Sequence, residues 1–351
     1  MSQTWWQKSI KPIAARIVGL AARKPDAASE HQATIFVFGT KLLVTLRGID
    51  AATAQAATAK LEQQFHYMQR NWNAWKSGEL TDLNQAIANG RSMAVSPHLL
   101  GLIEMAKRFE SLSDGLFNPA LGGIVGAWGF HSDERPMGYR PDLPAISALA
   151  LRMPTMGDVS IEGTVVACTN NRVQFDFGGF AKGVALDMAE ETLKSFGIQN
   201  TLLNAGGDIN SMGNGGVCPW RISIRDPKSS GIIATITLAP DEKVYTSGNY
   251  ERFHEIDGVR FAHTLDPRSA MPVDHIISAT VIADRGSLAD AAATALTVAG
   301  PHDWHRIARK MGVKYALLVD ERGGIHLNPE MRARISFSSD RAFTLSESPP
   351  L

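Results

Sequence analysis

Residues 176–187 read DFGGFAKGVALD, and they mark the place where an extended segment passes into a helix. The helix is predicted over residues 180–196, and Gly197 closes it because a left-handed C-terminal cap favours glycine. A short strand is predicted over residues 200–204 and runs into Ala205-Gly206-Gly207-Asp208. The centre of the sequence therefore places one helix between strands.

Further strands lie on both sides of this segment, mostly in pairs. They are predicted over residues 33–48 (two strands around Gly39-Thr40), 159–176, 220–225, 232–238, 250–265 (a hairpin turning on Asp257-Gly258), 276–284 and 314–320. Helices are inserted between them: one aligns Leu61, Phe65, Met68 and Trp72, one begins at Ser96-Pro97, and two more cover residues 288–299 and 302–311. This order predicts an α+β fold with largely antiparallel sheets.

Composition excludes several classes of protein. The chain has 351 residues, of which 44% are hydrophobic and 20% charged, and 35 basic residues balance 35 acidic ones. A nucleic-acid-binding protein would show a basic excess, so we expect no nucleic-acid partner. No run of about 18 apolar residues is present, so we expect no transmembrane span.

We expect three regions along the chain. Residues 1–32 form an N-terminal segment and linker with an export-like basic and apolar pattern, residues 33–339 form one folded domain, and residues 340–351 form a flexible tail. The apolar run is short and is interrupted by Arg16, which favours a cytoplasmic location. A periplasmic or membrane-associated location through the N-terminal segment is the alternative.

The glycine-rich segment has two interpretations. Small residues at the start of a helix let backbone N–H groups approach a phosphate, and Lys182 adds a positive charge. The spacing matches neither GxGxxG nor a Walker A motif, and from this segment alone a tight strand-to-helix turn is the favoured interpretation.

Asp290 and Thr294 lie four residues apart on a predicted helix, so their oxygens share one face. A carboxylate and a hydroxyl suit Mg²⁺, which prefers oxygen ligands. Spacing alone, however, favours a simpler alternative, in which Ser287 to Asp290 form a capping box.

His263 ends the 250–265 hairpin, where a histidine is either a general base or structural. Trp75 either stacks on a planar ligand or packs in the core.

Taken together and in order, seven segments resemble the ApbE family of flavin transferases, the FAD:protein FMN transferases. They are residues 75–84 (WKSGELTDLN), 114–130 (DGLFNPALGGIVGAWGF), 176–187, 204–208, 246–248, 263–272 (HTLDPRSAMP) and 289–300 (ADAAATALTVAG). The resemblance runs from about Phe38 to about residue 337 and implies an ApbE-like fold. It also implies an activity: the protein cleaves FAD, releases AMP and attaches FMN through a phosphoester to a Ser or Thr of an acceptor flavoprotein.

The resemblance assigns roles to particular residues. It implies that Mg²⁺ is held by Asp290, Thr294 and the backbone carbonyl of Gly179. With that match, the metal interpretation of Asp290 replaces the capping one. His263 is the candidate for deprotonating the acceptor hydroxyl or holding the diphosphate. The positions that match FAD contacts are Phe38, Trp75, Leu116, Phe117, Asn118, Asp176, Lys182 and Leu265.

Five residues depart from the family pattern. Phe38 stands where Met is usual, Asn118 where Asp is usual, Gly178 where Ser is common, and Ser269-Ala270 replaces Thr-Gly. Two other functions use the same residues. The first is an FAD pyrophosphatase, in which water replaces the acceptor hydroxyl and free FMN is released. The second is a non-catalytic flavin-binding protein, which the presence of Asp290, Thr294 and His263 argues against.

Overall fold

The structure is a computed structural model that describes residues 30–132, 140–216, 218–250, 252–339 and 342–351. Most of the N-terminal segment with its export-like pattern therefore lies outside the described residues. The helices are α2 Ala51–Asn71, α3 Glu79–Ala88, α4 Pro97–Leu112, α5 Gly122–Ala127, α6 Leu143–Ala150, α7 Ala181–Ser195, α8 Gly286–Met311 and α9 Pro329–Arg334, with a 3-10 turn at Met156–Asp158. Among the described residues, no helix combines the length and apolarity needed to cross a bilayer.

Nine strands form the main sheet, in the order β1-β2-β6-β7-β10-β15-β16-β17-β19. Their bounds are β1 Glu30–Val37, β2 Thr40–Arg47, β6 Asn200–Ala205, β7 Asp208–Met212, β10 Lys243–Gly248, β15 Ile276–Ala283, β16 Tyr315–Asp320, β17 Ile325–Leu327 and β19 Leu345–Glu347. Every neighbouring pair is antiparallel except β17 and β19. The predicted α+β class with largely antiparallel sheets is confirmed.

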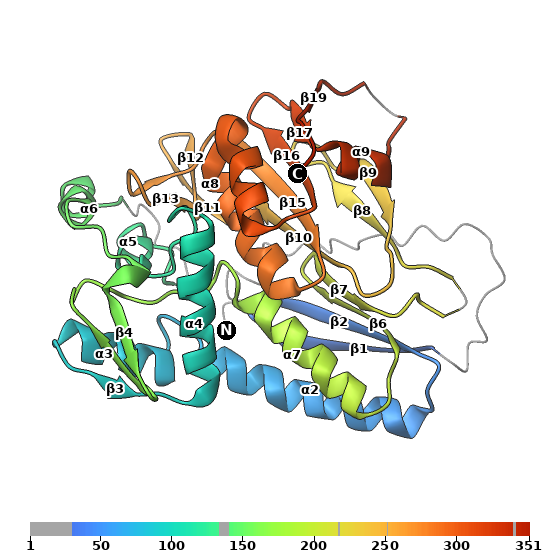
Figure 1. Cartoon of the computed structure of the whole chain (residues 1–351), viewed down its shortest axis with the longest axis horizontal. Coiled ribbons are helices and arrows are strands. Elements are labelled where there is room, and N and C mark those ends of the chain that lie inside the picture. The colour runs from blue at the N-terminus through green and yellow to red at the C-terminus, as the bar shows by residue number, and fades with distance from the viewer. Residues whose placement is uncertain (1–29, 133–139, 217, 251, 340–341) are drawn as a thin grey trace.

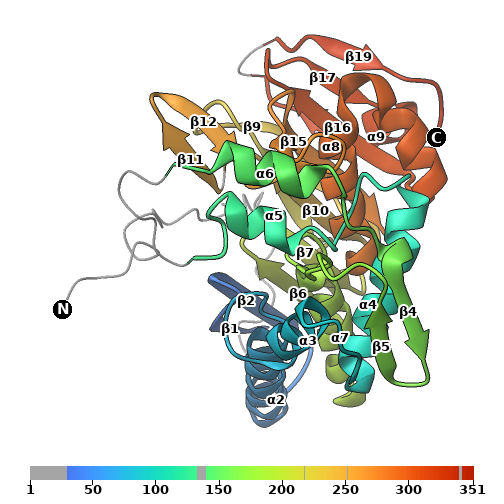
Figure 2. The same ribbon diagram turned by 90° about the vertical axis from the view of Figure 1, so that its left-hand side faces the viewer.

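Four small sheets complete the fold. They contain β3 Met93–Ala94 with β5 Val165–Cys168 and β4 Val159–Glu162; β18 Ile335–Phe337 with β9 Ile232–Thr237 and β8 Arg221–Arg225; β11 Phe253–Ile256 with β12 Val259–Ala262; and β13 Leu265–Asp266 with β14 Met271–Pro272. Figure 2 shows the β11–β12 hairpin beside α5 and α6.

Alternation along the strands of the main sheet builds two separate cores, because successive side chains point to opposite faces. On β10, Tyr245 belongs to the core beneath the helices, whereas its neighbour Val244 packs with β8 and β9. On β16, Leu318 and Leu317 divide in the same way. Helices α2, α7 and α8 thus cover one face of the sheet, and the three-stranded β18-β9-β8 sheet packs against the other (Figure 1).

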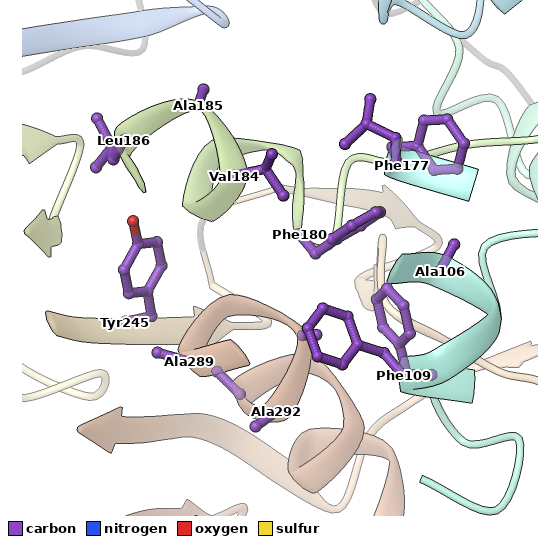
Figure 3. Close-up of a cluster of buried hydrophobic side chains, with 14 of the residues drawn as sticks. Ala106, Phe109, Phe177, Phe180, Val184, Ala185, Leu186, Tyr245, Ala289 and Ala292 are labelled. Atoms are coloured by element: carbon purple, nitrogen blue, oxygen red, sulfur yellow. The ribbon is translucent and has the colours of Figure 1, made fainter. Parts of the chain in front are cut away.

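An aromatic cluster fixes the segment that enters α7. Phe180, which is completely buried, meets Phe109 of α4 at a centroid distance of 5.9 Å and Phe117 at 5.5 Å, both edge to face. Figure 3 shows Phe180 close to Phe109, with Phe177 above it and to its right. Edge-to-face packing restricts the orientation of the rings as well as burying them. The DFGGF segment is therefore held rigidly where the three helices meet.

Local predictions agree with the structure at the turns. Asp257 and Gly258 both have positive φ (51° and 79°), as a type I′ turn requires. The two helices predicted over 288–311 form one element, α8, with a kink at Gly300 (φ 77°) ahead of Pro301. The expected flexible tail differs: Leu345–Glu347 form β19, because they extend the main sheet beside β17.

Candidate functional site

A buried amide anchors the loop that precedes α7. Asn84 of α3 donates from Nδ2 to the carbonyl of Phe175 (2.9 Å), and its Oδ1 accepts the N–H of Phe175 (2.7 Å). The side chain thereby imitates a strand and pairs both backbone groups of one residue, which a buried segment requires. The WKSGELTDLN segment that carries Asn84 thus has a structural role beside the 176–187 segment.

The N-terminal ends of α7 and α8 touch and exchange hydrogen bonds. A Cβ atom at Gly183 would lie 2.3 Å from the carbonyl oxygen of Gly286, so only glycine permits this contact. Gly183 N–H donates to Oδ2 of Asp290 (2.9 Å). In return, the carboxylate of Asp187 on α7 accepts N–H bonds from Gly286 (2.7 Å) and Ser287 (2.9 Å).

These bonds correct the capping interpretation of Asp290. Helix α8 begins at Gly286, earlier than predicted, and its N-cap residue Arg285 makes no side-chain capping bond. Two orphan N–H groups of the first turn, those of Gly286 and Ser287, are satisfied by Asp187 from the neighbouring helix. The carboxylate of Asp290 instead accepts the N–H of Gly183 on α7, which places this carboxylate at the junction of the two helices.

Oxygen atoms gather at this junction. Thr294 Oγ1 donates to the carbonyl oxygen of Gly179 (3.2 Å), one helical turn from Asp290. Burial and, after it, the negative charge of Asp208 raise the pKa of Asp290 to about 7. Lys182 is the cation that pairs with Asp208, and the pKa of Asp290 stays raised despite its charge. A divalent cation with oxygen ligands would supply further positive charge beside Asp290. The three residues that the resemblance assigns to Mg²⁺ therefore fit a metal.

Few side chains could serve as metal ligands at this junction. Among the described residues, no three His, Cys, Asp or Glu side chains are gathered as a metal-binding group. A cation here would use a carboxylate, a hydroxyl and a backbone carbonyl, with water or substrate oxygens completing its shell, as Mg²⁺ commonly does. Lys182 lies beside this set and forms an ion pair with Asp208, whose other oxygen accepts the N–H of Thr246 at 3.2 Å.

A second group of site residues surrounds Asp176. Its Oδ2 lies 2.8 Å from Nε2 of His131, and its Oδ1 accepts the N–H of Gly178 at 2.8 Å. Burial acts to raise the pKa of Asp176, but the hydrogen bond and charge of His131, together with the Gly178 N–H and the charge of Arg252, outweigh it. The pKa therefore falls below its ordinary value. The imidazole of His131 also stacks on Trp75, with centroids 5.3 Å apart. The guanidinium of Arg252 lies 5.5 Å from the same indole ring.

His263 lies between β12 and β13, at the end of the predicted hairpin. Its Nδ1 lies 3.1 Å from the carbonyl oxygen of Arg252. A carbonyl only accepts, so Nδ1 carries the proton and Nε2 keeps its lone pair. Burial, followed by the positive charges of Arg252 and Lys182, lowers the pKa of His263 to about 4. The imidazole is therefore neutral at pH 7, as a proton acceptor must be.

The other residues predicted to contact FAD are buried or make local contacts. Leu116, Phe117 and Leu265 are buried, and Phe117 packs on Gly179. Asn118 holds its own loop, donating to the carbonyl of Pro154 (2.9 Å) and accepting the N–H of Ala120 (2.9 Å). Phe38 sits in the β1–β2 turn, with its ring 5.9 Å from Phe65.

Sequence reasoning missed three residues: Asp187, His131 and Arg252. Asp187 ends the quoted 176–187 segment, and His131 follows the quoted 114–130 segment by one residue. Arg252 lies inside the predicted 250–265 hairpin. All three residues lie in or next to a segment that the sequence analysis discusses, and that proximity is the only sequence signal for them. Their bonding partners come from other parts of the chain.

The chain has clear relatives among known proteins. The chain is 46% identical over 316 residues to an FAD:protein FMN transferase of Rhodobacter capsulatus, covering 90% of this chain and 60% of that relative. It is 28% identical to a Klebsiella pneumoniae protein of the same name, covering 95% of this chain and 98% of the relative. The chain thus spans about three fifths of the first relative and nearly all of the second.

Solved structures show the same fold. The ApbE protein of Thermotoga maritima superimposes with a TM-score of 0.77 at 28% identity, covering 84% of this chain and 96% of that one. The flavin transferase ApbE of Vibrio cholerae gives a TM-score of 0.77 at 24% identity, with 88% and 99% covered, and this likeness concerns the fold. The class of protein that the fold defines is an ApbE-type α+β protein. The ApbE family profile matches residues 38–317, and the chain belongs to the ApbE family.

Proposed function

We propose that this enzyme cleaves FAD and transfers its FMN part to a Ser or Thr hydroxyl of an acceptor flavoprotein, with release of AMP. The observation that carries the proposal is the junction of α7 and α8, where Asp290, Thr294 and Gly179 supply oxygen atoms beside Lys182. In the reaction, the acceptor oxygen bonds to the phosphorus on the FMN side of the diphosphate. The bond from that phosphorus to the bridging oxygen breaks, and AMP departs with the electron pair.

The residues at the junction have distinct tasks. Asp290, Thr294 and the carbonyl of Gly179 would hold Mg²⁺, which when bound neutralises charge on the diphosphate oxygens. Lys182 is oriented by Asp208 and contributes a positive charge next to the same oxygens. The N-terminal end of α7 adds the partial positive charge of a helix terminus, which favours a phosphate.

His263 is the candidate base. With Nδ1 bonded to the Arg252 carbonyl, its Nε2 can take the proton of the acceptor hydroxyl. A hydroxyl is a weak nucleophile at neutral pH, and a positioned base typically contributes about 10²–10⁴-fold in rate. The lowered pKa keeps the base unprotonated, although it also makes the imidazole a weaker base than an exposed one.

The flavin-contact residues support FAD as the donor. Trp75 offers an aromatic face, and its Nε1–H is buried without a hydrogen-bond acceptor in the described part of the chain. Asp176 stays ionised and can accept N–H groups from a ring edge. An aromatic surface, an unsatisfied donor and a carboxylate suit a planar heterocycle that carries both donors and acceptors.

The test incubates the purified chain with FAD, Mg²⁺ and a candidate acceptor flavoprotein. We expect flavin fluorescence that stays with the acceptor band on a denaturing gel, and one AMP released for each flavin attached. AMP and free FMN without a labelled acceptor would instead identify a pyrophosphatase. Bound FAD without any AMP would identify a flavin-binding protein.

A further inference from the structure

His131 joins two residues of the flavin site but has no part in the function proposed above. It lies just after α5, and its imidazole is 12% exposed. The ring contacts Asp176 at the entrance to α7 and Trp75 between α2 and α3. One side chain therefore connects two positions that match FAD contacts and lie on separate segments of the chain.

The contact with Asp176 fixes the direction of the carboxylate. Nε2 of His131 lies 2.8 Å from Oδ2, and the N–H of Gly178 donates to Oδ1 at 2.8 Å. With both oxygens held, the carboxylate group of Asp176 has a fixed orientation. An ionised carboxylate has about four lone-pair positions, so each oxygen can still accept another hydrogen bond. The pair with His131 orients Asp176 without exhausting its capacity as an acceptor.

The contact with Trp75 fixes the indole plane. The two rings are tilted by only 20° and their centroids lie 5.3 Å apart, which is offset stacking. The buried Nε1–H of Trp75 finds no acceptor among the described residues. Buried donors are normally paired in native proteins, and this N–H is available to an acceptor atom of a ligand.

The position of the His131 imidazole depends on Gly126. A Cβ atom at Gly126 of α5 would lie 3.0 Å from Nδ1 of His131 and 3.6 Å from its Cγ. The 3.0 Å contact with Nδ1 is tighter than ordinary van der Waals packing, so a larger residue at this position would shift the ring. The absence of a side chain at Gly126 is therefore part of what places His131 between Trp75 and Asp176.

We infer that His131 is a positioning residue that holds Trp75 and Asp176 as one recognition unit for a planar heterocycle of FAD. In this unit Trp75 provides the stacking surface, and Asp176 accepts an N–H group from the ring edge. The inference rests on the proposed function. Both the imide edge of the flavin and the amino edge of adenine carry such N–H groups, so the chemistry is shared and the experiment separates the two rings.

Three substitutions separate the two contacts of His131. His131→Phe keeps a stacked ring but loses the hydrogen bond to Asp176, His131→Gln keeps a donor without the ring, and His131→Ala loses both. Titration calorimetry with FAD should show the weakest binding for Ala, by about ten- to hundredfold, because a bond to a charged group is lost. Phe and Gln should each recover part of that loss. The Mg²⁺-induced rise in Tm should stay unchanged in all three.

A glycine pair supplies the matched control. Gly126→Ala should weaken FAD binding in the same direction as His131→Ala, whereas Gly101→Ala in α4 should not, because a Cβ at Gly101 meets no atom within 4 Å. Titrations with FMN and with AMP then identify the ring: only the ligand that carries the recognised ring should lose affinity in His131→Ala.

The outcomes are distinguishable from those of the proposed function. If wild-type protein binds no FAD, the proposed function fails and the inference with it. If wild-type protein binds FAD and transfers FMN while folded His131→Ala binds FAD as tightly or more tightly, only the inference is overturned. Equal losses of FMN and AMP affinity, together with a lost Mg²⁺ response, would show that His131 supports the fold instead.

Discussion

The carboxylate of Asp187 on α7 accepts the backbone N–H of Gly286 at 2.7 Å, at the residue where α8 begins. Because Asp187 also accepts the N–H of Ser287, it caps a helix to which it does not belong. Asp290, one turn further along α8, returns a bond to Gly183 of α7. The two helices thus fix each other in position, and the oxygen-rich junction between them is a consequence of that mutual capping.

Replacing Asp187 tests this arrangement. Asp187→Asn puts an amide donor opposite backbone donors, and we expect the free energy of unfolding to fall by about 1–2 kcal/mol. The Mg²⁺ concentration for half-maximal transfer should also rise, because α8 carries Asp290 and Thr294. Ser96→Ala, which removes the cap of α4 away from the junction, is the control. A Mg²⁺ requirement equal to wild type in Asp187→Asn would separate the cap from the site.

The close contact at Gly183 gives a second prediction. Gly183→Ala forces a methyl group to within 2.3 Å of the Gly286 carbonyl oxygen, so one helix must move. We expect destabilisation of more than about 2 kcal/mol and the loss of most transferase activity. Gly101→Ala should be neutral or stabilising, by up to about 1 kcal/mol, since alanine favours a helix interior. Denaturant unfolding of both variants makes the comparison, and similar stabilities would argue against a forced contact.

The secondary structure was predictable because its signals are local, whereas the site depends on contacts between distant residues. Ser96-Pro97, Asp257-Gly258 and Gly197 mark helix and hairpin ends through their own backbone preferences. Asp187, by contrast, bonds to a residue 99 positions away, Asn84 to one 91 positions away, and His131 to one 45 positions away. Spacing could place Asp290 and Thr294 on one helical face, but the bond from Gly183 of α7 to Asp290 could be found only in the tertiary structure.

Asp290→Asn should lower transferase activity and raise the stability of the metal-free protein. In the metal-free protein the raised pKa means that ionising Asp290 opposes folding, and stability is lost as the pH rises from about 4 through about 7. At pH 8 the neutral amide removes this cost, so the variant should be more stable in EDTA by about 1–3 kcal/mol. It should nevertheless lose the Mg²⁺-induced rise in Tm and the transferase activity. Thermal unfolding in EDTA and in Mg²⁺ measures both effects, and an unchanged Mg²⁺ response would remove Asp290 from the metal site.

The pKa of His263 predicts how acid affects the enzyme. The group has a pKa of about 4 when folded and an ordinary value of 6.5 when unfolded. Between these pH values the unfolded chain binds a proton that the native protein does not, so stability falls as the pH drops from 6.5 towards 4. The part due to His263 amounts to about 2–3 kcal/mol. For the same reason, protonation of His263 should slow transfer only near pH 4, well below the range in which an exposed histidine titrates.

His263→Gln isolates this contribution. Its amide can still donate to the Arg252 carbonyl but does not titrate, and every other ionisable group is shared with wild type. The stability lost between pH 7 and pH 4.5, measured by urea unfolding, should therefore be smaller in the variant by about 2 kcal/mol. Transfer at pH 7.5 should fall by about a hundredfold or more, with FAD affinity retained, because the proton acceptor is gone. Identical pH dependence in the two proteins would mean that His263 titrates normally, and an unchanged transfer rate would assign the base to another residue.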